Sequence, residues 1–177
     1  MKKILLFFFV ILYTHILSAK EQTIVYVDFD KVVSESKPGS VLIKQLDDIY
    51  SKTLENFEIV ETNLKEKEST IISQKNILSD EKYRNMVKEL RNDINNYKQE
   101  RNKKSAEFQN IKIRNTNEFL KLINPIISEY SQEKSISIIL QKKNIVVGKK
   151  ELDITEIIIK LVNENIKEFS IKWKITI

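Results

Sequence analysis

One closely spaced acidic pair, Asp28 and Asp30, lies beside a predicted strand and could in principle act in acid–base catalysis. On a continuous strand the two carboxylates would share a face, as a catalytic pair requires. However, no histidine, glycine-rich loop or serine-centred motif accompanies them. We therefore interpret Asp28 as the N-cap of a following helix, and we expect the protein not to be an enzyme.

Nucleophiles and metal ligands are just as scarce. The sequence has no cysteine, and its one histidine, His15, lies in an N-terminal segment that we expect to be removed. The mature chain would then lack a thiol nucleophile, an imidazole base and the ligands of a His/Cys zinc site. It also lacks a phosphate-binding loop, so we expect neither ATP dependence nor a cofactor.

The N-terminal segment, residues 1–19, has the pattern of a secretory signal peptide. Lys2 and Lys3 precede an apolar run over residues 4–12, and small residues follow at Ser18 and Ala19. Cleavage near Ala19 would release an exported protein. The alternative is an uncleaved membrane anchor, although the run is shorter than the ~20 apolar residues of a membrane span.

The overall charge is basic but mixed, with 30 Lys and Arg against 25 Asp and Glu. Loss of Lys2 and Lys3 would leave 28 basic residues against 25 acidic ones. A nucleic-acid-binding protein usually concentrates its basic residues in one patch. Together with export, this balance indicates that nucleic acid is not a partner.

Basic residues in the second half of the chain's long helical region are candidates for binding an acidic partner or an anionic surface. Each contact would be weak, but together they would attract a partner in a salt-sensitive way. The candidates are Lys82, Arg84, Lys88, Arg91, Lys98, Arg101, Lys103 and Lys104.

These side chains are positioned by a predicted pair of long helices. The chain has 2 Gly and 2 Pro, which suits long helices with few turns. Apolar residues recur mostly at steps of three, four or their sum from Leu42 to Leu78, and a steadier alternation of four and three follows from Tyr83 to Leu122, with Glu118 on the second seam. Ser79 would cap the second helix. The two helices would form an antiparallel hairpin with arms of roughly 60 Å.

Two places weaken that pattern. Arg101 and Lys104 lie on the second seam, where they either extend their charges into solvent or leave the arm loosely packed. Asn124–Pro125 either kinks the second helix or begins a new one. In both cases we expect the chain to change direction there.

Short strands are predicted at residues 24–27, 136–140 and 145–147, and they make sense as one small sheet. Asp153 and Glu156 form a predicted capping box for a last helix. The alternating residues 171–177 indicate either a further strand or a frayed terminus.

The predicted fold is thus mainly α, with a long antiparallel helical hairpin inserted into a small β body. The segments are a signal peptide (1–19), a body (20–36 and 135–169), an arm (37–134) and a tail of unassigned role (170–177). So small a core with free sheet edges favours an oligomer whose sheets join. The residues expected in that shared body are Ile24, Tyr26, Val27, Ile136, Ile138, Leu140, Ile145 and Val147.

Several motifs in this order resemble the Skp/OmpH family of periplasmic chaperones. IVYVDFDKVVSESKPG (24–39) resembles the family's first strand, short helix and joint. The two-helix arm, the proline of NPII at Pro125, and SISIILQKKNIVVGKKELDIT (135–155) are also similar to the family in position.

The resemblance implies a homotrimer whose three helical arms enclose a cavity. It implies that the cavity holds unfolded outer-membrane proteins without ATP. Lys103 and Lys104 match a basic pair that belongs to a proposed lipopolysaccharide-binding site in one member of the family, so lipopolysaccharide or an anionic membrane surface is a further candidate partner. The alternative function is a structural coiled-coil envelope protein, tethered to the inner membrane, without client binding.

Overall fold

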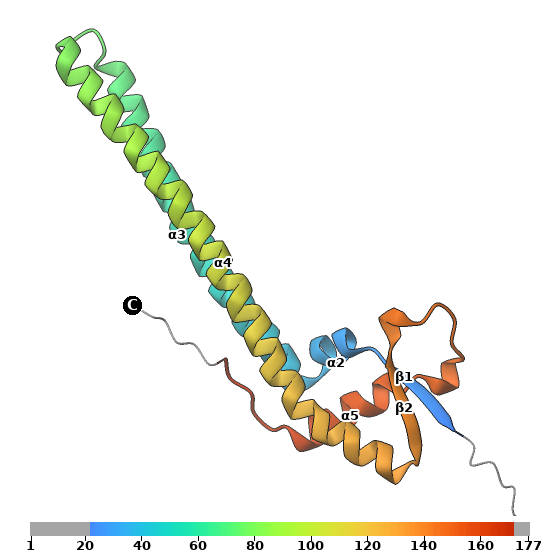
Figure 1. The fold of residues 1–177 in the computed structure, drawn as a ribbon. Helices are drawn as coiled ribbons and strands as arrows, with labels where there is room; N and C mark the ends of the chain where they lie inside the picture. The colour runs from blue at the N-terminus through green and yellow to red at the C-terminus, as the bar shows by residue number, and fades with distance from the viewer. Residues whose placement is uncertain (1–21, 172–177) are drawn as a thin grey trace, which may run out of the picture.

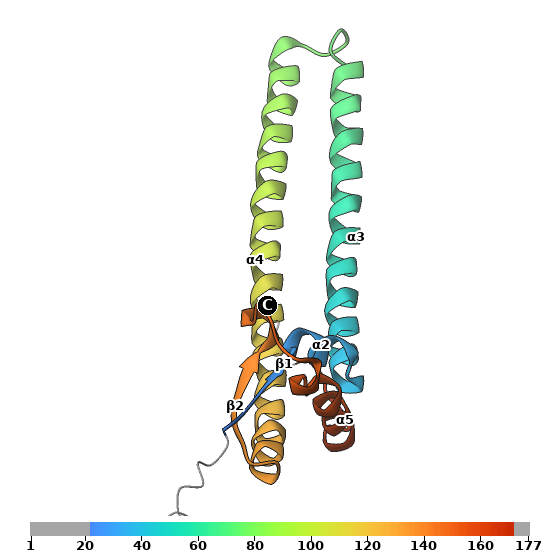
Figure 2. The ribbon, with the colours of Figure 1, turned by 90° about the vertical axis from the view of Figure 1, so that its right-hand side faces the viewer.

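The computed structural model describes residues 22–171, which form a small body with one long two-helix arm (Figures 1 and 2). The predicted signal peptide and the predicted tail beyond Ile171 lie outside the described residues. The mainly helical fold with a small sheet confirms the predicted fold class.

The body begins with strand β1 (Thr23–Val27) and the short helix α2 (Phe29–Glu35). Asp28 is the N-cap of α2, and its side chain accepts a hydrogen bond of 3.0 Å from the backbone N–H of Lys31. This confirms the interpretation of Asp28 as a cap. Asp30 lies exposed in the first turn of α2, so the two carboxylates do not share a strand face.

A tight joint connects α2 to the first arm helix, α3 (Lys37–Ser73). Ser36 caps α3, and Pro38 lies in its first turn, where proline costs no helical hydrogen bond. A Cβ atom at Gly39 would come within 2.0 Å of the carbonyl oxygen of Val33. Only glycine therefore allows the two helices to approach so closely.

The second arm helix, α4 (Asp80–Glu133), returns antiparallel to α3 and is capped by Ser79, as predicted (Figure 2). The helix runs through Asn124–Pro125, so the expectation that a new helix could begin there was wrong. Pro125 is exposed, and water can therefore satisfy the carbonyl group that loses its helical partner.

The sheet has two parallel strands rather than the three that we predicted. β2 (Ile136–Gln141) pairs with β1, with Ile24 opposite Ile138 and Tyr26 opposite Leu140. The prediction of a strand at residues 145–147 was wrong. The chain there lies between the 3-10 turns Lys142–Asn144 and Lys150–Leu152.

The second edge of β1 explains why that third strand does not form. Tyr26 makes a single bridge with Asp153, and the Ile154 N–H donates to the Tyr26 carbonyl at 2.9 Å. Ile145 is half-buried, whereas Val147 is exposed, so neither side chain takes part in the sheet.

Helix α5 (Thr155–Asn165) closes the body, but not through the predicted capping box. Its N-cap is Ile154. The Asp153 carboxylate accepts from the Thr155 N–H at 3.0 Å, and Glu156 pairs with Lys31 of α2 instead of reaching back. The acidic residues therefore connect α5 to its neighbours as well as shaping its first turn.

The core lies where the sheet, α2, α5 and the root of the arm meet. Phe119 and Ile123 of α4 are part of this core. The buried positions at this end of α4 are therefore 115, 119 and 123, and not the predicted seam positions Glu118 and Leu122. Phe119 and Ile123 thereby join a core cluster that also contains Leu42 and Leu46 of α3. The core cluster comprises Val25, Val27, Val32, Leu42, Leu46, Phe119, Ile123, Ile154, Ile158, Ile159 and Val162.

Candidate functional site

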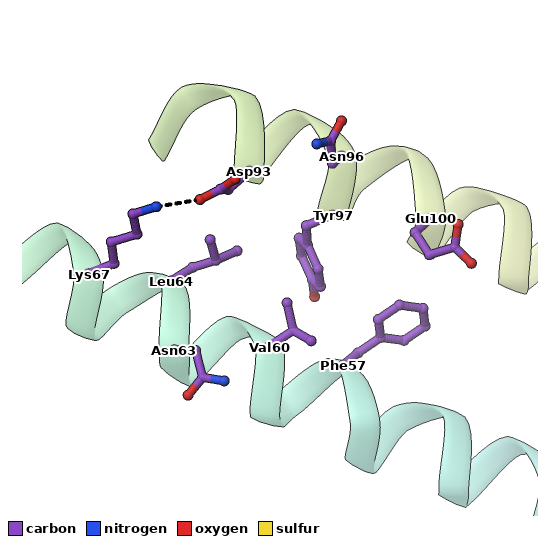
Figure 3. A pocket seen from close by; sticks show the side chains of 9 residues that line it. All are labelled: Phe57, Val60, Asn63, Leu64, Lys67, Asp93, Asn96, Tyr97 and Glu100. Atoms are coloured by element: carbon purple, nitrogen blue, oxygen red, sulfur yellow. Dashed lines mark hydrogen bonds and ion pairs between the residues drawn. The ribbon is translucent and has the colours of Figure 1, made fainter. Parts of the chain in front are cut away.

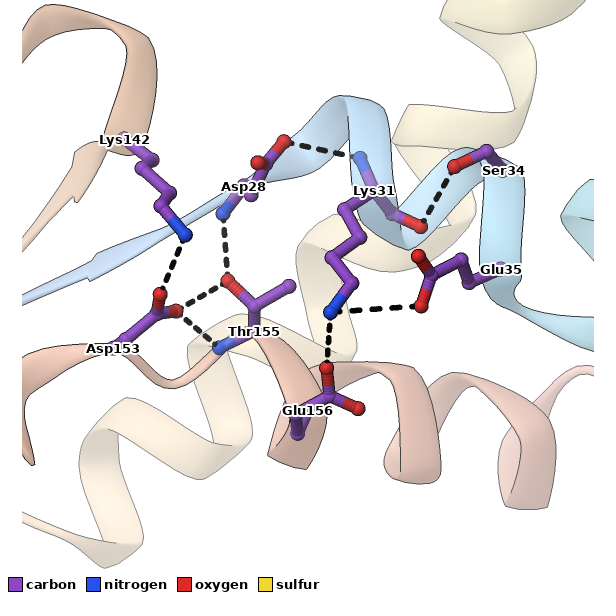
Figure 4. Close-up of polar contacts among 8 residues, drawn as sticks. All are labelled: Asp28, Lys31, Ser34, Glu35, Lys142, Asp153, Thr155 and Glu156. Carbon is purple, nitrogen blue, oxygen red and sulfur yellow. Dashed lines mark hydrogen bonds and ion pairs between the residues drawn. The ribbon is translucent and has the colours of Figure 1, made fainter. Parts of the chain in front are cut away.

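A polar network fixes β1, α2 and α5 relative to one another (Figure 4). The Asp28 N–H donates to Thr155 Oγ1 at 2.9 Å, and Thr155 Oγ1 donates in turn to Asp153 Oδ1. Lys31 pairs with Glu156, and with Glu35 at 3.6 Å. The carboxylates of this network and the Thr155 hydroxyl are therefore engaged in contacts that hold the three elements together.

Asp153 also holds the loop that follows β2. Its Oδ2 lies 2.9 Å from Lys142 Nζ. Burial alone would raise the pKa of the Asp153 carboxyl, but the hydrogen bonds from Lys142 and Thr155 outweigh burial and lower this pKa below 3.8. Asp153 is thus ionised at neutral pH and stabilises the folded body.

The outer face of the sheet is apolar and mostly uncovered. Ile24, Ile138 and Leu140 are 42%, 43% and 43% exposed, and they lie on the face opposite Val25, Val27 and Ile139. Tyr26 shares the outer face but is buried, with its hydroxyl donating to the Lys149 carbonyl at 3.1 Å. Parallel strands are normally covered on both faces, so this surface favours contact with another chain.

The six predicted shared-body residues that lie in the sheet divide into two groups. Tyr26 and Val27 are buried in their own chain, and Ile136 packs against its core. Ile24, Ile138 and Leu140 remain available at the surface. Their role in assembly stays a prediction.

The shaft of the arm contains few buried side chains. Between Leu46 and Ile71 no residue of α3 is buried, and none of α4 is buried between Leu90 and Asn115. Aromatic contacts bridge the two helices at Tyr50–Phe108 and Phe57–Tyr97, with ring centroids 5.0 and 5.8 Å apart. The helices are therefore held by a thin apolar seam.

Polar pairs supplement this seam. Lys67 of α3 lies 2.7 Å from Asp93 and 3.2 Å from Glu89 of α4, and these carboxylates raise the pKa of Lys67. Glu61 of α3 accepts from the Tyr97 hydroxyl. Burial and this hydrogen bond raise the pKa of Tyr97, so its hydroxyl stays protonated and able to donate.

Two apolar hollows lie between the arm helices. One, of about 580 Å³, is bordered by the Lys67–Asp93 pair (Figure 3). It is lined by Phe57, Val60, Asn63, Leu64, Lys67, Asp93, Asn96, Tyr97 and Glu100. The other, of about 730 Å³, lies nearer the body. We name this second hollow the root groove; it is lined by Ile49, Lys52, Thr53, Asn56, Phe57, Val60, Glu100, Lys104, Glu107, Phe108 and Ile111.

The predicted basic residues all lie on α4. Arg84, Lys88, Arg91 and Lys98 are exposed, and their spacing of three, four and seven residues places them on one face of the helix. Lys82 and Lys103 are also exposed. Within residues 22–171, no carboxylate forms an ion pair with Lys82, Lys88, Arg91, Lys98 or Lys103, so these charges are available to a partner.

The two basic seam residues differ from that group. Arg101 is exposed and lies 3.4 Å from Glu61. Lys104 is half-buried in the root groove, where its hydrogen bond to Glu107 raises its pKa. Of the neighbouring pair Lys103 and Lys104, one charge therefore faces solvent and the other is bound within the arm.

The sequence profile of the family described as Outer membrane protein (OmpH-like) matches residues 23–162. The chain belongs to the OmpH-like family. This match covers β1, both arm helices, β2 and most of α5. No curated protein matched the chain.

A solved structure shares the fold of this OmpH-like chain. It is a protein from Caulobacter crescentus CB15 described as a "putative outer membrane chaperone (OmpH-like)", with a TM-score of 0.75 and 14% sequence identity. The similarity covers 86% of this chain and 90% of that one. In the part of the chain from 22 to 171, no helix has the length and apolar character of a membrane span.

The root groove and the Thr155 network were not anticipated from the sequence. Phe57, Phe108 and Ile111 lie within the two predicted seams, where their spacing indicates only helix packing. The one available signal is the charged seam residue Lys104, which predicts weak packing without locating a hollow.

Proposed function

We propose that this protein is a periplasmic holdase chaperone that binds unfolded outer-membrane proteins and prevents their aggregation without ATP. The observation that carries the proposal is the match of the OmpH-like family to residues 23–162. The arm supports it physically, because the arm exposes apolar side chains and unpaired basic groups instead of using them for its own packing.

The proposed active form is a homotrimer. A single chain leaves Ile24, Ile138 and Leu140 exposed on one face of its sheet. Burying that face between copies would remove apolar surface from water at about 25 cal/mol per Å². Three bodies joined in this way would project three arms around a shared cavity.

Client capture would proceed by many weak contacts. An unfolded barrel protein presents alternating apolar residues, which suit shallow apolar hollows better than one deep pocket. The exposed basic face of α4, from Arg84 to Lys98, would attract acidic clients and would also suit lipopolysaccharide or an anionic membrane surface. No step in this process breaks or forms a covalent bond, so the proposed function is not enzymatic.

The test is an aggregation assay with residues 20–177. A urea-unfolded outer-membrane barrel protein is diluted into buffer with increasing amounts of the chain, at low and high salt, without ATP. We expect turbidity to be suppressed at about three chains per client, and less efficiently at high salt because charge attraction is screened. Unsuppressed turbidity with a folded, oligomeric sample would contradict the proposal.

A further inference from the structure

The segment after α5 runs along the root of the arm. Phe169 packs edge-on against Phe119 of α4, with ring centroids 5.1 Å apart. Two residues later, the Ile171 N–H donates to Gln45 Oε1 of α3 at 2.8 Å. This segment lies beyond residues 23–162, which the OmpH-like family matches, so the family does not account for it.

The segment travels toward the tip of the arm. Tyr50 of α3 faces Phe108 of α4, and the two helices are antiparallel, so Phe119 lies level with the first turns of α3. Gln45 therefore lies nearer to the tip of the arm than Phe119 does. The described chain accordingly rises from α5 beside the arm (Figures 1 and 2). Continuing in this direction from Gln45, the next turn of α3 presents Ile49, where the root groove begins.

The residues that follow Ile171 match the groove in length and in pattern. Trp173, Ile175 and Ile177 alternate with Lys172, Lys174 and Thr176. In an extended chain, every second residue faces the same side and advances by about 6.6 Å. Four residues of a helix advance by about 6 Å. The groove residues Ile49, Thr53 and Phe57 are spaced by four, so each could receive one apolar residue of the tail.

We propose that residues 172–177 bind in the root groove of their own chain in an extended conformation. Trp173 lies against Ile49, Ile175 against Thr53, and Ile177 against Phe57. Ile171 already packs against the core cluster. Trp173, Ile175 and Ile177 follow it at every second position, so in an extended chain they face the same side as Ile171. Lys172 and Lys174 then face solvent, and no charge is buried without a partner.

A disulfide test can locate the tail, because the sequence has no cysteine. In residues 20–177, Thr53→Cys is combined with Ile175→Cys, and the matched control combines Leu54→Cys with Ile175→Cys. Leu54 neighbours Thr53 but does not line the groove. A disulfide requires Cα atoms within about 7 Å. We expect mild oxidation to cross-link the first pair within one chain, and the control pair several-fold less.

Equal cross-linking of both pairs, no cross-linking of the first pair, or a product with the mass of two chains would overturn the proposal. The last outcome would place the tail on a neighbouring chain. The test requires no client, so its result is independent of the proposed chaperone function.

Trp173 provides a second readout, because it is the single tryptophan of the sequence. We expect its emission in the folded protein to be blue-shifted and protected from acrylamide quenching. Thr53→Arg should shift it toward the emission of the urea-unfolded chain, whereas Leu54→Arg should leave it unchanged. Water-like emission in the unsubstituted folded protein, or the same response to both variants, would overturn the proposal.

Discussion

The body and the arm of this protein use apolar residues in opposite ways. The body encloses a core in which Val27, Phe119 and Ile158 are fully excluded from solvent. The arm buries almost nothing between its root and its tip, and it leaves residues such as Leu54, Ile59 and Val60 exposed. The comparison indicates that the body supplies stability, whereas the arm leaves apolar and basic side chains exposed to solvent.

The largest expected effect contrasts one phenylalanine in each region. Phe119→Ala should lower the free energy of unfolding by about 3–5 kcal/mol, because it leaves a cavity in the core. Phe57→Ala should cost only about 1 kcal/mol, because the half-buried ring makes mainly one edge-on contact with Tyr97. Urea unfolding followed by circular dichroism measures both. Equal losses would contradict the division of roles.

The next effect separates folding of the body from its assembly. Ile138→Asp should dissociate the oligomer while each chain stays folded, because the side chain is exposed on the outer face of the sheet in a single chain. Light scattering gives the mass, and circular dichroism gives the helical content. Ile113→Asp, on the exposed side of α4, is the matched control and should leave the mass unchanged. A full-size Ile138→Asp oligomer would exclude this face as the interface.

A smaller effect is expected from charge on the arm. The double variant Lys88→Glu and Arg91→Glu should slow capture of an unfolded barrel protein several-fold at low salt, with the difference shrinking at high salt. Stopped-flow fluorescence of a labelled client measures the rate. Lys149→Glu and Lys150→Glu make the same charge change in an exposed loop of the body and should have little effect. Equal slowing by both doubles would show that net charge, and not the arm, matters.

The smallest effect concerns pH and the body. Asp153 has a lowered pKa, so its stabilising contribution is present above its unfolded pKa of 3.8 and is lost as the pH falls through the lower folded value. Asp153→Asn keeps an acceptor for Thr155 but removes the charge opposite Lys142. The melting temperature of this variant should therefore be lower at pH 7, and the gap should narrow as the pH falls below 3.8. A gap that is independent of pH would mean that the Asp153 charge has no role. The control is Asp48→Asn, which removes an exposed charge and should not produce this pH-dependent gap.

The arm was easier to predict from the sequence than the body. The hairpin follows from local signals, because Ser79 and the repeating apolar positions act within a few residues of one another. The N-cap role of Asp28 has the same local origin. Such signals persist in the folded chain because the arm has few tertiary contacts that could override them.

The errors lie where distant segments meet. Residues 145–147 have the composition of a strand, but Tyr26 already pairs with Asp153 on that edge of β1. Glu156 has the spacing of a capping box, but Lys31 from α2 attracts it. The root groove likewise arises from half-filled positions on two helices, and their sequence spacing does not reveal the space left between them.

The most direct test of the central claim is the mass of the complex formed with an unfolded client. Residues 20–177 are mixed with a urea-diluted outer-membrane barrel protein, without ATP, and separated by size-exclusion chromatography with light scattering. We expect the mass of three chains for the protein alone, and of three chains plus one client for the complex. A chain that stays monomeric, or an oligomer that elutes without client, would contradict it.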